Sequence, residues 1–214
     1  MTEFTKRFYT SIFLIIALIL SIFNQIILTS FLILCLFQMF FEFYCMLKKI
    51  LFKKKKLLLL ISFIILLLLS YISLYVWLSF LDSQNDDQMY LLFIIIVAIS
   101  SDIGGYLFGK TFKGKKISKI SPNKTYSGMF GSYILSIVIS LIIFKNFLNI
   151  YELIILSIII STFSQIGDFL VSFIKRKAKL KDTGKILPGH GGLLDRFDSL
   201  ILSIPVGSIM VMII

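Results

Sequence analysis

The sequence predicts an all-α, polytopic transmembrane protein with about seven spans and a cytoplasmic amino terminus. Three observations predict this fold class. Hydrophobic residues make up 58% of the 214 residues and the mean hydropathy is +0.97, whereas soluble domains are roughly 45–50% apolar. Apolar segments of about 20 residues, the length that crosses a bilayer, recur along the chain. Lysine and arginine lie almost entirely in alternate connections between these segments, as the positive-inside rule requires.

Seven apolar segments come near the length of a membrane-spanning helix, for which about 17 to 25 residues suffice. The first resembles a signal peptide because Lys6 and Arg7 precede it, but no small-residue cleavage site follows, so we expect a retained span. Only three prolines occur and no stretch reads as a linker, so residues 1–214 are expected to form one integral membrane domain. The segments are 8–23, 26–47, 57–81, 89–109, 131–147, 151–174 and 197–214.

The orientation follows from the basic residues. With the amino terminus in the cytoplasm, 21 of the 22 Lys and Arg residues fall on the cytoplasmic side, and only Lys145 falls on the other. The net charge of +11 is therefore explained by the membrane orientation and by attraction to anionic lipid headgroups. It requires no nucleic acid partner. Six or eight spans stay open as alternatives.

Cysteine and histidine usage limits the chemistry. Cys35 and Cys45 lie in an apolar segment without CxxC spacing, so the sequence indicates neither a disulfide framework nor a zinc site. His190 is the only histidine in the sequence. Any bound metal must therefore be held by oxygen ligands, as Mg²⁺ is.

Polar residues recur on the sixth apolar segment at steps of three or four, which places them on one helical face. Serines at this spacing can serve helix packing alone, but Gln165 and Asp168 in the same stripe favour a functional role. An unpaired aspartate in apolar surroundings would cost several kcal/mol, so we expect a cation to face Asp168. The stripe comprises Ser157, Ser161, Ser164, Gln165, Asp168, Ser172 and Lys175.

The stretch that follows reads KRKAKLKDTGKILPGHGGLLDRFD and holds seven basic residues. Glycines let backbone N–H groups approach anionic oxygens, and lysine and arginine compensate the charge, so this stretch is typical of a polyphosphate-binding loop. A plain basic loop would explain the lysines but not Pro188 to Gly192. Asp195 and Asp198 lie three residues apart at a helix start and share one side, and helix capping would explain only one of them. Mg²⁺ prefers one or two carboxylates with water and phosphates, so Asp168 with Asp195 would suffice.

A second polar patch runs from Ser100 to Gly131 and carries Asp102 near membrane depth. It contains no GxGxxG spacing and no Walker lysine motif. The turn Ser121-Pro122-Asn123-Lys124-Thr125 is suited to presenting hydroxyls and an ammonium group to a phosphate.

These motifs together resemble the signature of phosphatidate cytidylyltransferases, also called CDP-diacylglycerol synthases. The resemblance covers about residues 97–202 and leaves 8–96 as variable amino-terminal spans. In the second patch, Tyr126, Ser127 and Ser132 depart from the family's usual tryptophan, glutamate and glycine. Phe41-Glu42-Phe43 resembles an early intramembrane glutamate of the family, but we predict no catalytic role for Glu42. The matching residues include Ser101, Asp102, Gln165, Asp168, Ser172, Lys175, Arg176, Lys181, Asp182, Pro188 to Gly192, Asp195, Arg196 and Asp198.

The resemblance implies transfer of a cytidylyl group from CTP to phosphatidic acid, with CDP-diacylglycerol and pyrophosphate as products. It implies Mg²⁺, alone or with a second cation, and a multi-pass protein of the inner plasma membrane whose active site faces the cytoplasm. The choice of cytidine and of phosphatidic acid depends on the resemblance alone. The acyl-chain preference, the choice between CTP and dCTP, and the oligomeric state, a homodimer included, stay open.

We predict three groups of site residues. His190 could donate to the pyrophosphate leaving group or organise the loop. The predicted metal ligands are Asp168, Asp195 and Asp198. The predicted catalytic residues are Asp168, Lys175, Arg176, Lys181, Asp182, His190, Asp195, Arg196 and Asp198. The predicted substrate-binding residues are Asp102, Ser121, Lys124, Thr125, Ser172, Gly189, Gly191 and Gly192.

Three alternatives stay open. A CTP-dependent lipid or polyprenol kinase would transfer the γ-phosphate and release CDP. An ion- or proton-coupled transporter would line its pathway with Asp102, Asp168 and Asp195. A non-catalytic membrane scaffold would explain the shorter amino-terminal spans and Ser127 in place of glutamate.

Overall fold

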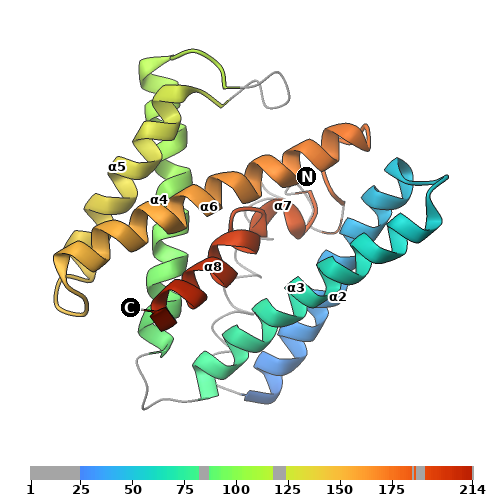
Figure 1. Cartoon of the computed structure of the whole chain (residues 1–214), viewed down its shortest axis with the longest axis horizontal. Helices are drawn as coiled ribbons and strands as arrows, with labels where there is room; N and C mark the ends of the chain where they lie inside the picture. Colours follow the sequence, from blue (N-terminus) through green and yellow to red (C-terminus); the bar gives the residue numbers. More distant parts are fainter. Residues whose placement is uncertain (1–24, 82–86, 118–123, 185, 187–190, 214) are drawn as a thin grey trace, which may run out of the picture. The chain divides into compact units, whose positions relative to one another are not determined.

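The computed structural model describes residues 25–81, 87–117, 124–184, 186 and 191–213. Within these residues the protein is all-α, with seven helices labelled α2 to α8, and the predicted fold class is confirmed to that extent. Five helices are long and apolar enough to cross a membrane, so this is a multi-pass membrane protein (Figure 1). They are α2 (Gln25–Ile50), α3 (Lys55–Leu81), α4 (Asp87–Phe112), α5 (Tyr126–Ile143) and α6 (Ile150–Lys177).

The five helices correspond to the second to sixth predicted spans. The first predicted span, 8–23, lies outside the described residues. The last one differs from its prediction, because the chain forms the short helix α7 (Leu194–Phe197) and then α8 (Leu200–Ile213). The break between them lies at Asp198, whose Oδ1 accepts the Ser199 N–H at 3.1 Å. The apolar helix α8 lies within the seventh predicted span, and its crossing of the membrane stays a prediction.

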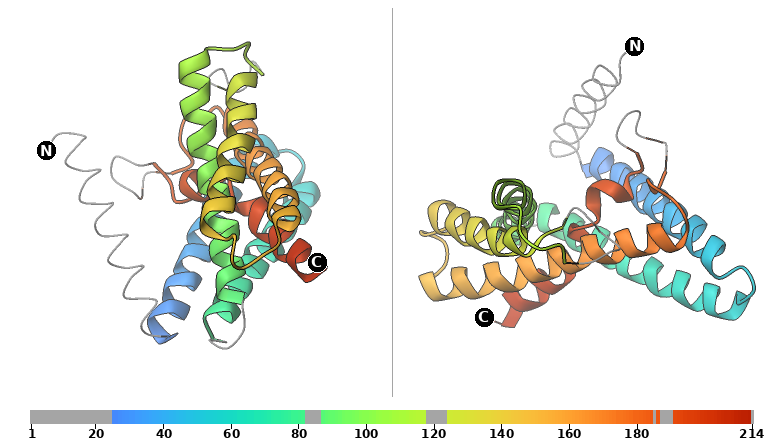
Figure 2. Two further views of the ribbon diagram at one scale, coloured as in Figure 1. Left: turned by 90° about the vertical axis from the view of Figure 1, so that its left-hand side faces the viewer. Right: turned by 90° about the horizontal axis from the view of Figure 1, so that it is seen from above.

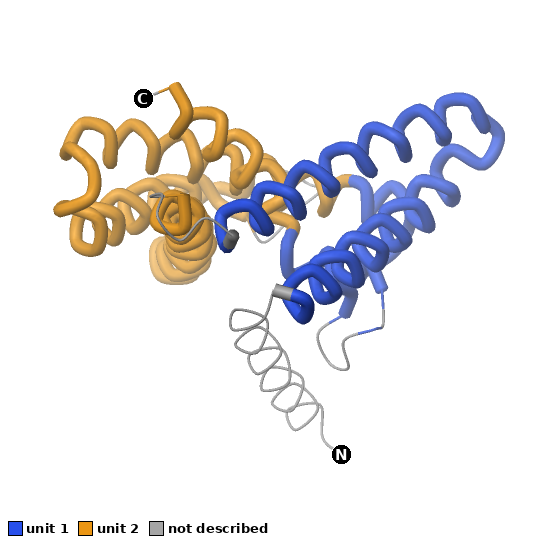
Figure 3. The backbone as a smooth tube through the Cα atoms, turned by 90° about the horizontal axis from the view of Figure 1, so that it is seen from below, with its two compact units in different colours: residues 1–84, 174–197 blue, residues 85–173, 198–214 orange. Residues whose placement is uncertain are grey.

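The chain divides into two compact units, residues 1–84 with 174–197 and residues 85–173 with 198–214 (Figure 3). In the first unit α2 and α3 pack against each other (Figure 1), and the four-residue connection 51–54 makes them antiparallel. Met46 and Leu69 are fully buried, and α7 contacts α2. This unit is therefore a helical hairpin, and the residues that end the predicted phosphate loop pack against its helix α2.

In the second unit α5 lies along α4 (Figure 2). The two helices approach closely at Gly104, where a Cβ would lie 2.5 Å from the carbonyl oxygen of Gly131. The Ser132 hydroxyl donates to the carbonyl of Ser101 at 2.7 Å across the same interface. Small residues at a helix interface in a membrane allow close packing of this kind. Ser132, a departure from the resembled family, is therefore an interhelical contact here.

Candidate active site

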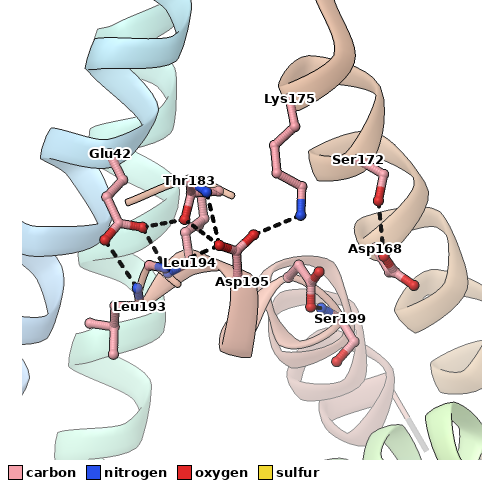
Figure 4. A network of polar contacts seen from close by, with 11 residues as sticks. Glu42, Asp168, Ser172, Lys175, Thr183, Leu193, Leu194, Asp195 and Ser199 are labelled. Carbon is pink, nitrogen blue, oxygen red and sulfur yellow. Dashed lines mark hydrogen bonds and ion pairs between the residues drawn. The ribbon is translucent and has the colours of Figure 1, made fainter. Parts of the chain in front are cut away.

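Asp195 is the centre of a polar network in the first unit (Figure 4). Its Oδ1 accepts the ammonium of Lys175 at 2.6 Å. Its Oδ2 accepts the Thr183 N–H at 2.8 Å, the Thr183 hydroxyl at 3.0 Å and the Gly192 N–H at 3.1 Å. The side chain of Asp195 is only 10% exposed and that of Lys175 14%. This carboxylate therefore connects the end of α6, the loop and the start of α7.

The surroundings of Asp195 keep it ionised. Burial raises its pKa, but the hydrogen bonds from Lys175, Thr183 and Gly192 and the charge of Lys175 lower it, so that the net pKa lies below the ordinary value of an aspartate. A carboxylate with such a pKa is negatively charged throughout the neutral range. It is thus ready to hold a cation or a lysine ammonium.

Glu42 in α2 joins the same network, although we predicted no catalytic role for it. It is 2% exposed, and its carboxylate accepts the N–H groups of Leu193 and Leu194, each at 3.0 Å. It also accepts the Thr183 hydroxyl at 2.6 Å and the Gln38 amide at 2.6 Å. The signal in the sequence was an acidic residue inside an apolar span, which is rarely there without a partner. Apart from Gln38, its partners lie more than 140 residues away in sequence, so no local pattern could identify them.

Two glycines of the predicted phosphate loop have other roles in the described structure. Gly191 has a φ of +84°, which favours glycine. A Cβ on Gly192 would overlap the Thr183 hydroxyl and the Glu42 carboxylate, and would lie 2.7 Å from the Gly184 nitrogen. The Gly192 N–H is already donated to Asp195. These glycines therefore let the loop pack against two carboxylates, and phosphate contact by either stays a prediction.

Gly192→Ala is expected to lower the thermal midpoint and to reduce activity at least tenfold. Overpacking of a well-packed site costs about 1–3 kcal/mol, and here the added methyl group also meets backbone. The control is Gly109→Ala in α4, where the Cβ would lie 3.1 Å from the Thr125 hydroxyl, and helical alanine is favoured over glycine by roughly 0.5–1 kcal/mol. Thermal unfolding of both detergent-solubilised variants measures the difference, and equal midpoints would contradict this account of Gly192.

Asp168 in α6 is the centre of a second cluster, which lies in the second unit. Its Oδ2 pairs with the Lys124 ammonium at 2.7 Å, and its Oδ1 accepts the Ser172 hydroxyl at 3.3 Å. Lys124 also lies over the ring of Phe169, 5.9 Å from its centroid. The expectation that a cation faces Asp168 is confirmed.

Asp102 in α4 belongs to the cluster around Asp168. The Ser164 hydroxyl is 3.5 Å from its Oδ1, and the Ser199 side chain is a further hydrogen-bond partner. Asp102 and Asp168 are close enough to interact electrostatically. The second unit therefore gathers two carboxylates, one lysine and several hydroxyls.

The first three residues of the predicted polar stripe of α6 are buried, and the other four are partly exposed. Ser157, Ser161 and Ser164 are fully buried. The Ser161 hydroxyl lies 2.8 Å from that of Ser101 in α4, and the Gln165 amide donates to Ser161 at 3.3 Å. The amino-terminal part of the stripe thus contacts the neighbouring helix α4, while its carboxy-terminal part carries Asp168.

Thr125 and Ser127 organise the loop before α5. Thr125 is the N-cap of α5, and its hydroxyl accepts the Gly128 N–H at 3.1 Å. The Ser127 hydroxyl accepts the Gly114 N–H at 3.2 Å and lies 3.0 Å from the Thr125 hydroxyl. Ser127 therefore closes the loop where the resembled family usually has a glutamate. Thr125 as a substrate contact stays a prediction.

The other described residues of the predicted site are mostly exposed. Arg176, Lys181, Asp182 and Arg196 have exposed side chains, and Asp198 is partly buried beside Ser199. Exposed basic side chains can collect phosphates, so their predicted roles stand as predictions. Ser121, Gly189 and His190 lie outside the described residues.

The described residues contain no group of three or more His, Cys, Asp or Glu side chains that could hold a metal ion. Magnesium, however, commonly uses one or two carboxylates and completes its shell with water and phosphate. Asp168 and Asp195 each hold a lysine ammonium at 2.7 and 2.6 Å. Both therefore offer oxygen donors at positions already suited to a positive charge, and this donor chemistry fits magnesium.

Comparison with known proteins gives a consistent result. A family model described as the Cytidylyltransferase family matches residues 1–214. A protein of Staphylococcus haemolyticus named phosphatidate cytidylyltransferase is 42% identical over 135 residues, which are 61% of this chain and 52% of that protein. One of the same name from Rickettsia typhi is 39% identical over 139 residues, 60% of this chain and 61% of that protein. The chain thus aligns with about half of the staphylococcal protein's length.

Proposed function

Because this chain belongs to the Cytidylyltransferase family, we propose that it transfers a cytidylyl group from CTP to phosphatidic acid, giving CDP-diacylglycerol and pyrophosphate. The observation that carries this proposal is a pair of lysine–carboxylate contacts, Lys175 with Asp195 and Lys124 with Asp168. Carboxylates and lysines in such pairs are the groups that a magnesium–polyphosphate substrate needs. Relatives named phosphatidate cytidylyltransferase support the choice of substrates.

We propose that the active site faces the cytoplasm and that the amino terminus lies on the same side. Glu42, Asp102 and Asp168 each lie within about ten residues of the helix end that leads into a lysine-rich connection, a rise of roughly 15 Å at most. The positive-inside rule assigns such connections to the cytoplasm. In the inner plasma membrane, phosphatidic acid would keep its acyl chains in the bilayer and present its phosphate at this depth.

The reaction needs no covalent enzyme intermediate. A phosphate oxygen of phosphatidic acid, already anionic, attacks the α-phosphorus of CTP. The bond from that phosphorus to the oxygen bridging to the β-phosphate breaks, and pyrophosphate leaves with the bonding electrons. The protein has to align two polyanions and to neutralise charge as it develops, which is its usual contribution to such transfers.

Lysines contribute most directly to this neutralisation. An ammonium group has three N–H donors, so Lys175 and Lys124 can each keep a carboxylate and still contact phosphate oxygens. The exposed Arg176 and Lys181 would gather the polyphosphate as it approaches. His190 is assigned to donation toward the pyrophosphate or to loop organisation, as the sequence suggests.

Asp168 and Asp195, with Asp198, are the residues we propose to hold Mg²⁺, alone or with a second cation. When bound, Mg²⁺ supplies positive charge to the phosphate oxygens. Asp195 is held for this task by Thr183 and Gly192, and Asp168 by Ser172. A ligand fixed by hydrogen bonds is better oriented than a free one.

The test of this function is a label-transfer assay with purified protein, Mg²⁺ and phosphatidic acid. With CTP labelled on the α-phosphate, we expect label in the lipid product and release of unlabelled pyrophosphate. With CTP labelled on the γ-phosphate, we expect the label in pyrophosphate. Diacylglycerol in place of phosphatidic acid is the matched control and should yield no labelled lipid.

Other outcomes of this assay would overturn the proposal. Transfer of γ-label to lipid with release of CDP would identify a lipid kinase. No transfer of either label, in a preparation that remains folded, would leave a transporter or a scaffold.

A further inference from the structure

We propose that Glu42 is a positioning residue of the active site, which holds Asp195 and the end of the glycine loop through Thr183, Leu193 and Leu194. This inference rests on the proposed function only for its catalytic consequence. The contacts themselves lie within the first unit and are visible in Figure 4. Glu42 acts through other residues and is not itself a reacting group.

Both oxygens of the Glu42 carboxylate are fully engaged in hydrogen bonds. Oε1 accepts the Leu193 N–H and the Gln38 amide, and Oε2 accepts the Leu194 N–H and the Thr183 hydroxyl. A carboxylate offers about four acceptor positions, so these four donors fill it. The residue is 2% exposed, and such a buried group is stable only when it is satisfied in this way. Its geometry therefore depends on the loop, and that of the loop depends on it.

Thr183 connects the carboxylates of Glu42 and Asp195. Its hydroxyl lies 2.6 Å from Glu42 Oε2 and 3.0 Å from Asp195 Oδ2. A hydroxyl has one proton to donate, so the two acceptors share it. The Thr183 N–H also donates to Asp195, which in turn holds Lys175. A continuous set of contacts thus runs from Glu42 to the lysine proposed to bind phosphate.

The contacts of Glu42 require a carboxylate and not an amide. Each Glu42 oxygen faces donors, and one of these donors on each oxygen is a backbone N–H. Glutamine would turn an NH₂ group toward the N–H of either Leu193 or Leu194, so it would lose at least one backbone hydrogen bond in either orientation. The change removes little volume, so any effect reports on polar contacts and not on a cavity.

Two glycines of the loop leave room for the Glu42 side chain. A Cβ on Gly184 would lie 2.8 Å from Glu42 Oε1, and a Cβ on Gly192 would overlap Oε2. Both glycines therefore leave the space that this carboxylate occupies. The acceptor is supplied by α2, whereas Thr183 and Asp195 come from the carboxy-terminal part of the chain.

The experiment combines hydrogen exchange with a double-mutant cycle on the full-length protein. Glu42→Gln is expected to raise the exchange rate of a peptide covering 191–197 at least tenfold, while peptides of α4 and α5 exchange as in the wild type. Glu42→Gln and Thr183→Val should each reduce kcat/KM by roughly 10- to 100-fold, the range found for residues that orient ligands. Thr183→Ser keeps the hydroxyl and should stay within threefold of wild type.

The cycle separates positioning from general damage. Independent losses multiply, so a merely structural role would make the double variant as impaired as the product of the singles. If Glu42 acts through Thr183, the kcat/KM of the double variant should lie within about threefold of that of the more impaired single variant. Glu152→Gln in α6 is the matched control, because its carboxylate accepts the N–H and the side-chain amide of Asn149 at the start of its own helix, and it should change neither exchange nor activity.

Three outcomes would contradict these expectations. Unchanged exchange of 191–197 in Glu42→Gln, or wild-type kcat/KM in that variant, overturns the inference. Multiplicative losses in the cycle overturn the positioning route through Thr183. A wild-type protein that forms no CDP-diacylglycerol overturns the proposed function and the catalytic consequence, whereas exchange still decides whether Glu42 holds the loop.

Discussion

Asp195→Asn is expected to reduce kcat/KM by on the order of 10²–10³, the loss typical of removing a key electrostatic group from an active site. The substitution places an NH₂ group against Lys175 or against the donors Thr183 and Gly192, so at least one of these contacts is lost. It also leaves the mostly buried ammonium of Lys175 without its counter-ion, which is strongly unfavourable. Steady-state kinetics with CTP, phosphatidic acid and Mg²⁺ measure the effect.

The control for this prediction is Asp87→Asn, the same chemical change at an exposed residue in the first turn of α4. An acidic residue there contributes only about 0.3–1 kcal/mol through the helix dipole, so activity should stay within twofold of wild type. Near wild-type turnover of Asp195→Asn would remove Asp195 from the site.

Asp168→Asn is expected to lower kcat/KM about 10²-fold and to raise the Mg²⁺ concentration that gives half-maximal activity. The variant keeps a side chain that Ser172 can contact but loses the charge that pairs with Lys124. A proposed metal ligand should change the metal dependence, because magnesium binds carboxylates far better than amides. A magnesium titration of activity provides the measurement.

Lys124→Gln separates the two roles in this pair. If Lys124 contacts phosphate, the variant should raise the KM for CTP roughly tenfold, a change of about 1.4 kcal/mol in binding, with an unchanged magnesium dependence.

An Asp168→Asn variant whose magnesium dependence equals that of wild type would contradict the assignment of Asp168 as a metal ligand, whatever its turnover.

Much of the fold and part of the site follow from local sequence patterns. Hydropathy over about 20 residues identified the spans that became α2 to α6, because a bilayer imposes its thickness on every crossing helix. The 3.6-residue period placed the polar residues of α6 on one face, and three of the four serines on that face are buried. The high cost of an isolated aspartate predicted a cation at Asp168, and Lys124 is there.

The last apolar segment shows where composition alone is insufficient. Hydropathy treats 197–214 as one span, whereas the chain leaves helical geometry between α7 and α8. At this break Asp198 accepts the backbone N–H of its neighbour Ser199, a local contact that hydropathy does not describe. Side chains that compete for backbone hydrogen bonds are typical of helix ends.

The sequence by itself determined the membrane class, the stripe on α6 and the carboxylates and lysines worth testing, because each is a property of residues near one another in the chain. Only the tertiary structure decided which partners these groups have. Glu42 finds Thr183 across 141 positions, and Gly192 proves to be required by that carboxylate and not by local backbone freedom alone. Such pairings depend on how helices and loops pack, and the periodicity of a single segment carries no information about its distant partner.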